Sequence, residues 1–170
     1  MGETACCHVT RVGVNLSNRA SQRRTHSLNP NQSIMPKSWS EKFAHPPKPS
    51  VSRLGKPYAG HGEGEKMLIP TPAVVAEYVK TIPKGESRTM PQLRADLAEA
   101  HHADFTCPLT AGIFLRIASE LAWEQHQSGK ALAKITPFWR AVDVKSPMAK
   151  KLACGVDFIV NQRRSEGLMS

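Results

Sequence analysis

Histidine, aspartate and cysteine side chains that could do chemistry lie close together in the second half of the chain. His101, His102, Asp104 and Cys107 supply imidazole, carboxylate and thiol groups, which in other settings bind zinc or activate a nucleophile. Their spacing matches none of the closed zinc patterns. The sequence places no histidine to activate Cys107, and a cysteine in apolar surroundings is more often simply buried. We therefore predict no metal, no cofactor and no catalytic residue.

A second thiol, Cys154, follows Lys150 and Lys151, whose charges are expected to lower its pKa and favour the thiolate. An enzyme that uses Cys107 or Cys154 is one interpretation, although a structural role is the commoner one for such cysteines. The remaining two cysteines are adjacent in a polar segment, so the four form no disulfide framework. This usage indicates a reduced, cytoplasmic setting.

The composition favours an anionic partner without identifying it. The 170 residues carry 23 lysines and arginines against 14 aspartates and glutamates, a formal net charge of +9. Such an excess attracts nucleic acid before membrane surfaces, yet more than half of it lies in residues 1–65. No run approaches the roughly 20 apolar residues that cross a bilayer, and the N-terminus lacks the apolar core of an export signal. We expect no membrane partner.

Residues 1–65 have the composition of a tail. Serine, asparagine, proline, glycine and basic residues dominate them, and apolar residues recur with neither helical nor strand period. Such a segment buries too little apolar surface to offset the entropy of ordering, so disorder is expected. Met35-Pro36-Lys37-Ser38-Trp39 resembles a natural start. The prediction is therefore an extension over residues 1–34 from an upstream initiation codon, then a basic Pro/Gly-rich tail over 35–65.

Residues 66–170 have the pattern of a mainly α domain. Thr71 and Pro72 form a cap and first turn ahead of an apolar stripe that ends at Pro83-Lys84-Gly85. The longest helix follows Thr106, its expected cap, and Gly129 ends it. The predicted elements are helices over 72–82, 89–101, 108–127 and 156–165, and a short strand-like segment over 135–142.

Apolar residues at helical spacing give the expected core. On the longest helix, Ile113, Phe114, Ile117 and Leu121 are expected to face inward. The turn between the second and third helices gives the outline of a helix-turn-helix or winged-helix unit. The inward residues expected on the other helices are Val74, Val75, Tyr78, Val79, Ile82, Leu93, Leu97, Phe158 and Ile159.

Four short motifs follow one another along this domain. Each alone has an ordinary interpretation: a turn between helices, a helix packed closely at its glycine, aromatic residues in a core, or a helix end. Their order is more specific than any one of them. The motifs are Ile82-Pro83-Lys84-Gly85 with Thr89 following, Thr110-Ala111-Gly112, Pro137-Phe138-Trp139-Arg140, and Glu166-Gly167.

In this order the motifs resemble those of the alkylguanine-DNA alkyltransferases, and most closely the non-catalytic alkyltransferase-like proteins. Residues 135–142 resemble the family's Pro-Cys-His-Arg-Val signature, in which the cysteine accepts the alkyl group of a damaged guanine. Phe138 stands in the place of that cysteine and Trp139 in that of the histidine, so alkyl transfer by the family's route is closed. Met90 replaces the tyrosine that rotates the target nucleotide, and Pro108 lies near the place of the intercalating arginine.

The resemblance implies a compact winged-helix domain whose longest helix lies along the minor groove of double-stranded DNA. It offers Arg116 as a substitute for the missing arginine. Arg140 is implied either as a scaffold contact or as a strut between the pocket segment and the last helix. The implied DNA-binding residues are Lys84, Arg88, Thr110, Gly112, Arg116 and Lys145, and the implied base pocket comprises Met90, Pro137, Phe138, Trp139 and Arg140.

The sequence thus favours a protein that engages DNA, with alkylated guanine as one target, performs no alkyl transfer, and has a repair protein as a further partner. The first alternative is a protein-interaction module on the same fold, with DNA binding lost. The second is the cysteine enzyme. Salt-dependent binding to duplexes with and without an alkylated guanine separates the first two.

Overall fold

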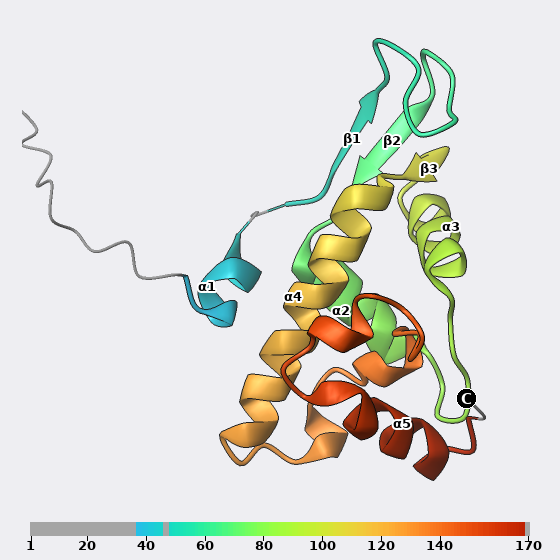
Figure 1. Ribbon diagram of the computed structural model, residues 1–170. Helices are drawn as coiled ribbons and strands as arrows, with labels where there is room; N and C mark the ends of the chain where they lie inside the picture. Colours follow the sequence, from blue (N-terminus) through green and yellow to red (C-terminus); the bar gives the residue numbers. More distant parts are fainter. Residues whose placement is uncertain (1–36, 46–47, 169–170) are drawn as a thin grey trace, which may run out of the picture. The chain divides into compact units, whose positions relative to one another are not determined.

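Five α-helices and three short β-strands make up residues 37–45 and 48–168, the part of the chain that the computed structural model describes (Figure 1). The domain is mainly helical, as predicted. The helices are α1 (Trp39–Ala44), α2 (Pro72–Thr81), α3 (Met90–Ala100), α4 (Pro108–Gln127) and α5 (Gly155–Ser165), and the strands are β1 (Ser50–Arg53), β2 (Lys66–Ile69) and β3 (Phe105–Thr106). Single turns of 3-10 helix lie at Leu132–Lys134, Phe138–Arg140 and Ala149–Lys151.

The first turns of α2 and α3 follow from local sequence chemistry. The Thr71 hydroxyl accepts a hydrogen bond from the Val74 amide at 3.2 Å. Thr89 forms a reciprocal capping box with Gln92, and both helices carry a proline in the first turn. The predicted starts of these two helices are confirmed.

Helix α4 begins differently from the prediction. Thr106 is not its cap, because it lies in β3 and its hydroxyl donates to the Arg94 carbonyl at 2.8 Å. Cys107 takes the N-cap position without a side-chain hydrogen bond. Strand β3 pairs in parallel with β2, with Met67 opposite Phe105. The sheet therefore fixes the first turn of α4, and the connection from α3 to α4 contains a strand as well as a turn.

Strands β1 and β2 form an antiparallel hairpin, with Ser50 opposite Ile69 and Arg53 opposite Lys66. The sheet order is β1-β2-β3. The hairpin loop, residues 54–65, is closed at its base by the Leu54 amide, which donates to the Glu65 carbonyl at 2.9 Å. Because β2 is the central strand, it connects the hairpin to the start of α4.

The segment from residue 37 to residue 65 carries ordered elements where the sequence predicted a disordered tail. Ser38 and Glu41 form a capping box that begins α1, and Trp39 lies beside the guanidinium of Arg116 on α4. Residues 37–45 and 48–168 belong to one compact unit. The order comes from hydrogen bonds to β2 and from contacts with α4, which composition does not reveal. The extension predicted over residues 1–34 lies outside the described residues.

The core lies between the helices and the segment that follows α4. The buried stripe of α4 is Ala111, Leu115, Ala118 and Ala122. Ile113, which was predicted to face inward, is 47% exposed, because it lies on the opposite side of the helix from that stripe. The prediction for Val75, Val79, Ile82, Leu93, Leu97 and Ile159 is confirmed, since all six are buried.

Residues 135–142 form no strand. Ile135 is extended, Phe138–Arg140 makes a turn of 3-10 helix, and Val142 is fully buried beneath it. Pro137 has no amide hydrogen to donate to a neighbouring strand. Because the segment is buried, its backbone amides need partners within the protein. The turn supplies one of them, since the Val142 amide donates to the Phe138 carbonyl at 3.0 Å.

Candidate nucleic-acid interface

The first two turns of α4 present an exposed apolar face. Leu109 is 63% exposed and Ile113, one turn later, is 47% exposed. Both lie opposite the buried stripe of the helix. Further along, the same face is covered, because Glu120 is buried and accepts a hydrogen bond from the Ala153 amide at 3.2 Å. The open part of the face is therefore confined to the start of the helix, where β3 holds it.

Gly112 lies between these two residues in sequence, and the space beside its Cα is open. A Cβ placed on Gly112 would meet no heavy atom within 4 Å. The structural explanation for a helical glycine, close packing against another helix, therefore fails at this position. Glycine inside a helix costs about 0.5–1 kcal/mol relative to alanine. The position exposes bare backbone on the open face of α4, where a ligand can approach closely.

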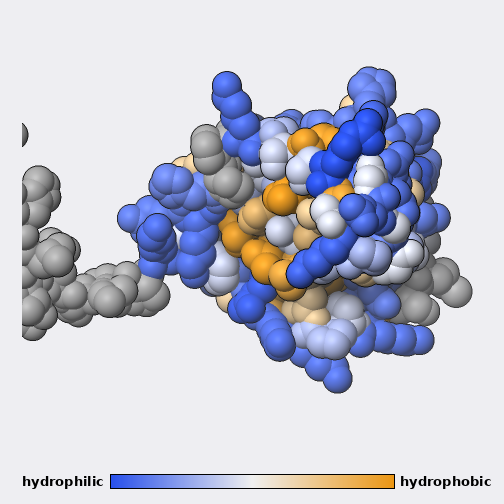
Figure 2. Space-filling view, turned by 90° about the horizontal axis from the view of Figure 1, so that it is seen from above, coloured by the Kyte–Doolittle hydropathy of each residue, from blue (hydrophilic) through white to orange (hydrophobic). Residues whose placement is uncertain are grey.

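The hairpin loop lies against the start of α4. The Tyr58 hydroxyl is 4.0 Å from the Cys107 sulfur, and the ring of His61 stacks on Phe105 with centroids 3.6 Å apart. Tyr58 remains 40% exposed and Val51, on β1, is 43% exposed. Figure 2 looks down on this end of the molecule and shows apolar surface bordered by hydrophilic side chains. The exposed basic residues of the hairpin region are Lys48, Arg53 and Lys56.

Arg116, which was implied to contact DNA, is engaged within the protein. Its Nη2 donates to the Lys151 carbonyl at 3.4 Å, and its Nε lies 3.7 Å from a carboxylate oxygen of Glu120. The Trp39 ring lies 5.6 Å from its guanidinium carbon. Arg116 therefore links α1, α4 and the loop before α5. This role leaves it a poor substitute for an intercalating arginine.

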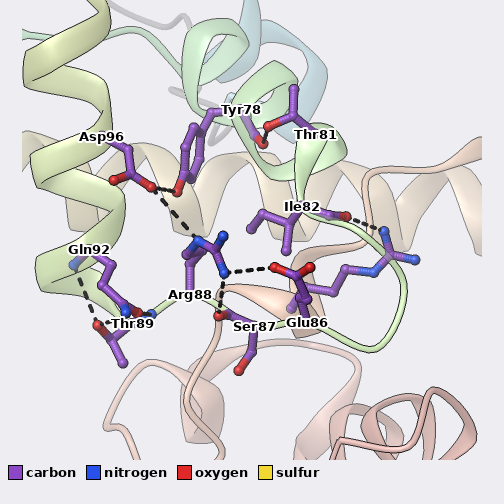
Figure 3. Close-up of polar contacts among 10 residues, drawn as sticks. Tyr78, Thr81, Ile82, Glu86, Ser87, Arg88, Thr89, Gln92 and Asp96 are labelled. Carbon is purple, nitrogen blue, oxygen red and sulfur yellow. Dashed lines mark hydrogen bonds and ion pairs between the residues drawn. The ribbon is translucent and has the colours of Figure 1, made fainter.

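Arg88 is similarly engaged, between α2 and α3 (Figure 3). Its guanidinium pairs with Glu86 at 3.1 Å and with Asp96 at 3.8 Å. Asp96 also accepts a hydrogen bond from the Tyr78 hydroxyl. Burial, followed by this hydrogen bond, raises the pKa of Tyr78 well above its usual range. The Arg88 amide donates to the Arg140 carbonyl at 2.8 Å, which ties this cluster to the segment after α4.

The implied base-pocket residues do not line one cavity. Met90 lines a cavity of 370 Å³ together with Arg88, Asp143 and Arg163. A separate cavity of 620 Å³ is lined by Lys84 and by three other members of the set, Pro137, Trp139 and Arg140, of which the first two are largely buried. Lys145, implied as a phosphate contact, is exposed in the loop beside Asp143.

Phe138 and Trp139 belong to the core rather than to a pocket for a flipped base. Phe138 is fully buried and Trp139 is 3% exposed. Their rings pack edge to face with centroids 5.6 Å apart, and Phe158 of α5 lies 6.1 Å from Phe138. The two rings therefore join the segment after α4 to α5. The expectation of a flat apolar surface for a base is wrong at Phe138, because no face of that ring reaches solvent.

Arg140 is the strut that the sequence offered as one alternative. Its Nε and Nη2 each donate to one carboxylate oxygen of Glu166 at 2.8 Å, and its Nη1 donates to the Ile82 carbonyl at 2.7 Å. Hydrogen bonds from Arg140 hold the pKa of Glu166 below its ordinary value, against the opposing effect of burial. Gly85, at φ +85°, lies beside this pair, and a Cβ there would approach the Glu166 carbonyl oxygen to 3.3 Å.

The pKa values of the two described cysteines are shifted in opposite directions. Burial, followed by the charge of Glu120, raises the pKa of Cys154 to about 11, which overrules the lowering expected from Lys150 and Lys151. Burial by itself raises the pKa of Cys107, but hydrogen bonding with Thr110 and Leu109 outweighs it and brings the pKa below its ordinary value. These partners are hydroxyl and amide groups, so none of them is a general base.

Alkylation of Cys154 by iodoacetamide at pH 8 is expected to be about a hundredfold slower than that of an ordinary thiol, because its thiolate fraction falls with the raised pKa. Peptide mass spectrometry over a time course measures the rate, and the urea-unfolded chain provides the control. Equal rates in the folded and unfolded chain would contradict the burial of this sulfur.

The candidate residues thus fall into separate groups. Thr110 and Gly112 lie at the open start of α4, Arg88 and Arg116 are engaged internally, and Lys84 and Lys145 lie in other loops. Sequence reasoning missed Leu109, although its spacing from Ala111 and Leu115 places it off the buried stripe.

Within residues 37–45 and 48–168, no group of three His, Cys, Asp or Glu side chains is arranged to hold a metal ion. The helices of this part of the chain are all too short or too polar to span a membrane. In comparisons with known proteins, no family model, curated protein or solved structure matches this chain.

Proposed function

We propose that this protein binds double-stranded DNA through the first turns of α4 and transfers no alkyl group. In this proposal the domain is a winged-helix relative of the alkyltransferase DNA-binding domain. Helices α3 and α4 form the helix-turn-helix pair, and the β1–β2 hairpin flanks α4 as a wing does. The order of the motifs along the sequence supports this assignment, and so does the parallel pairing of β2 with β3 directly before α4.

The observation that carries the proposal is the unpacked glycine on the open face of α4. Gly112 weakens the helix, and the space that a Cβ would occupy there is open. Leu109 and Ile113, one turn apart and both exposed, form an apolar ridge, and Gly112 lies on the helix surface beside that ridge. Close approach of a helix backbone to a narrow groove requires such a small residue at the contact.

The charges around this face suit a phosphate backbone. Lys48, Arg53 and Lys56 are exposed in the hairpin region, against the exposed carboxylates of Glu63 and of Asp104, which is bonded to the Lys66 amide. Arg53 also donates to the Gly64 carbonyl at 3.0 Å, which orders its side chain on the hairpin. Exposed basic residues supply the non-specific, salt-dependent part of DNA affinity.

The buried aromatic pair supports the absence of alkyl transfer. Phe138 occupies the nucleophile's place in the motif and is enclosed by the core, so neither a thiolate nor an open path to one exists at this position. Cys154 has a raised pKa, and the hydrogen-bonding partners of Cys107 include no base. Alkylated guanine is therefore, in this proposal, a ligand and not a substrate.

The Gly112→Ala variant tests the role of this glycine, because its expected effects on folding stability and on DNA affinity have opposite signs. A Cβ has open space there, so the variant is expected to be more stable by about 0.5–1 kcal/mol. The same methyl group would stand between the α4 backbone and the groove, so DNA affinity is expected to fall by about tenfold or more. Urea unfolding measures the first effect, and fluorescence anisotropy with a labelled duplex at low salt measures the second.

Gln127→Ala is the matched control, since Gln127 is an exposed position in the last turn of the same helix. It is expected to leave DNA affinity unchanged. The duplex is used with and without an O6-alkylated guanine, at several salt concentrations. Equal affinity of Gly112→Ala and the unaltered chain would contradict the role of α4, and negligible binding to both duplexes at low salt would overturn the proposed function.

A protein-interaction module is the second candidate, favoured by the engagement of Arg88 and Arg116 inside the domain. Two cations implied to contact phosphate are occupied, while the first turns of α4 expose apolar side chains. Under this alternative the open face of α4 binds a protein. Its signature would be partner binding that is lost in the Leu109→Asp variant and insensitive to salt.

A further inference from the structure

We infer that Leu109 is an apolar wedge that inserts between two stacked base pairs and kinks the duplex, an inference that rests on the proposed DNA-binding function. Among the described residues, Leu109 is the most exposed of the large hydrophobic side chains, at 63%. A leucine so exposed at the first turn of a helix buries little apolar surface within the fold. Together with Ile113 one turn later, it forms an exposed apolar face that is available for contact outside the domain.

The backbone that carries Leu109 is held firmly. Pro108 begins α4 with a fixed φ, and the Ala111 amide donates to the Cys107 carbonyl at 3.1 Å. Immediately before it, the Cys107 amide donates to the Leu68 carbonyl at 2.9 Å, so the helix start is attached to the sheet. A wedge must not yield when it enters a base stack, and this anchoring supplies that stiffness.

The other side chains near the start of α4 are less suited to this role. Pro108 is half-buried and lines a cavity with Phe105 and Arg94. Arg116 is engaged by Glu120 and the Lys151 carbonyl. Ile113 is less exposed than Leu109 and lies one turn further along. Leu109 is thus the most exposed apolar side chain at the rigid start of the helix.

The chemistry of the wedge determines what the protein would prefer in DNA. Leucine offers no hydrogen bond to a base, so insertion reads no base edge. Insertion requires two base pairs to unstack, and unstacking is easiest at mismatches, at damaged bases and at pyrimidine–purine steps. The expected specificity is therefore for a weakly stacked site, in which a lesion is recognised through lost stacking before any contact with the altered group.

Three measurements on the full chain test the inference. A duplex with 2-aminopurine beside a mismatch reports unstacking through its fluorescence, and a duplex with dyes at both ends reports the kink through energy transfer. Anisotropy gives the affinity for matched and mismatched duplexes. The unaltered chain is expected to raise the 2-aminopurine signal, shorten the end-to-end distance and bind the mismatched duplex about tenfold more tightly than the matched one.

Leu109→Ala is expected to lose all three responses while it retains salt-dependent binding to the matched duplex. Leu109→Met, another side chain that serves as a wedge, is expected to restore them. Ile113→Ala is the matched control, since it removes an exposed apolar side chain from the same face and is expected to weaken affinity about equally for both duplexes. Residue 109 is exposed, so thermal melting should confirm that each variant folds.

The outcomes separate this inference from the proposed function. Binding without a change in 2-aminopurine fluorescence, or a Leu109→Ala variant that unstacks and kinks DNA like the unaltered chain, would overturn the wedge and leave DNA binding intact. Absence of binding to every duplex would overturn both. Self-association in sedimentation equilibrium that Leu109→Ala abolishes would assign the exposed face to a protein contact and overturn the wedge.

Discussion

Replacement of Phe138 by alanine is expected to destabilise the domain by about 3–5 kcal/mol, the range for a large aromatic side chain deleted from a core. Phe138 is fully buried, its ring packs against Trp139 and Phe158, and the change would leave a cavity between the segment after α4 and α5. Urea unfolding monitored by circular dichroism measures the loss. A stability change near zero would show that this position is a pocket and not core.

Phe138→Leu is the matched control, because it retains an apolar side chain and most of the volume. It is expected to cost under about 1.5 kcal/mol. The two variants also distinguish a base pocket from a core position. If Phe138 lined a base pocket, both variants would alter DNA affinity with little change in stability, whereas a core position gives the reverse pattern.

Replacement of Arg140 by methionine is expected to destabilise the domain by about 3–5 kcal/mol, because it leaves the Glu166 carboxylate buried without its partner. The Arg140 side chain is 15% exposed and that of Glu166 is 8% exposed, so water can replace little of the lost interaction. The Ile82 carbonyl also loses its donor. Urea unfolding at neutral pH measures the effect.

The dependence on pH gives this prediction a second readout. The folded-state pKa of Glu166 lies below its ordinary value, so the pair stabilises the fold fully above the ordinary carboxyl pKa. That stabilisation is lost as the pH falls through the lowered value. The difference in stability between the unaltered chain and Arg140→Met should therefore shrink in acid. A difference that grows in acid would contradict the sign of this linkage.

The exposed pair Lys80 and Glu77, 2.7 Å apart, provides the matched control for a buried ion pair. Glu77→Gln is expected to change stability by less than about 1 kcal/mol. Replacement of Arg140 and Glu166 together by apolar residues of similar volume should recover part of the loss, because no unpaired charge then remains in the interior.

The helices could be predicted from the sequence because their signals are local. Thr71 with Pro72, and Thr89 with Gln92, set helix starts through contacts within four residues. The predicted range of 108–127 coincides with α4, since the apolar period and Gly129 define it. Where the deciding contact lies far away in sequence, prediction was poorer. Strand β1 exists because β2 pairs with it, although its own residues are all exposed.

In the candidate site, too, local features could be predicted from the sequence and features that depend on distant residues could not. Gly112 could be singled out from its place in a helical pattern, whereas its open surroundings could not be read from the sequence. The pKa of Cys154 is raised first by burial and then by the charge of Glu120, which is remote in sequence, so the neighbouring lysines misled the prediction. Phe138 could be recognised as incompatible with alkyl transfer, but its complete burial required the packing of α5.

The attachment of the hairpin to α4 has a consequence for how this surface can change during evolution. Strand β2 bonds to β3, and β3 leads directly into α4, so the base of the hairpin is fixed. The loop beyond it, residues 54–65, bends at Ala59, Gly60 and Gly64, all with positive φ, and contributes no residue to the main core. Insertions and deletions in such surface loops are well tolerated. Loop length is therefore a variable that lineages can alter to extend or shorten the contact surface while the core sequence stays constant.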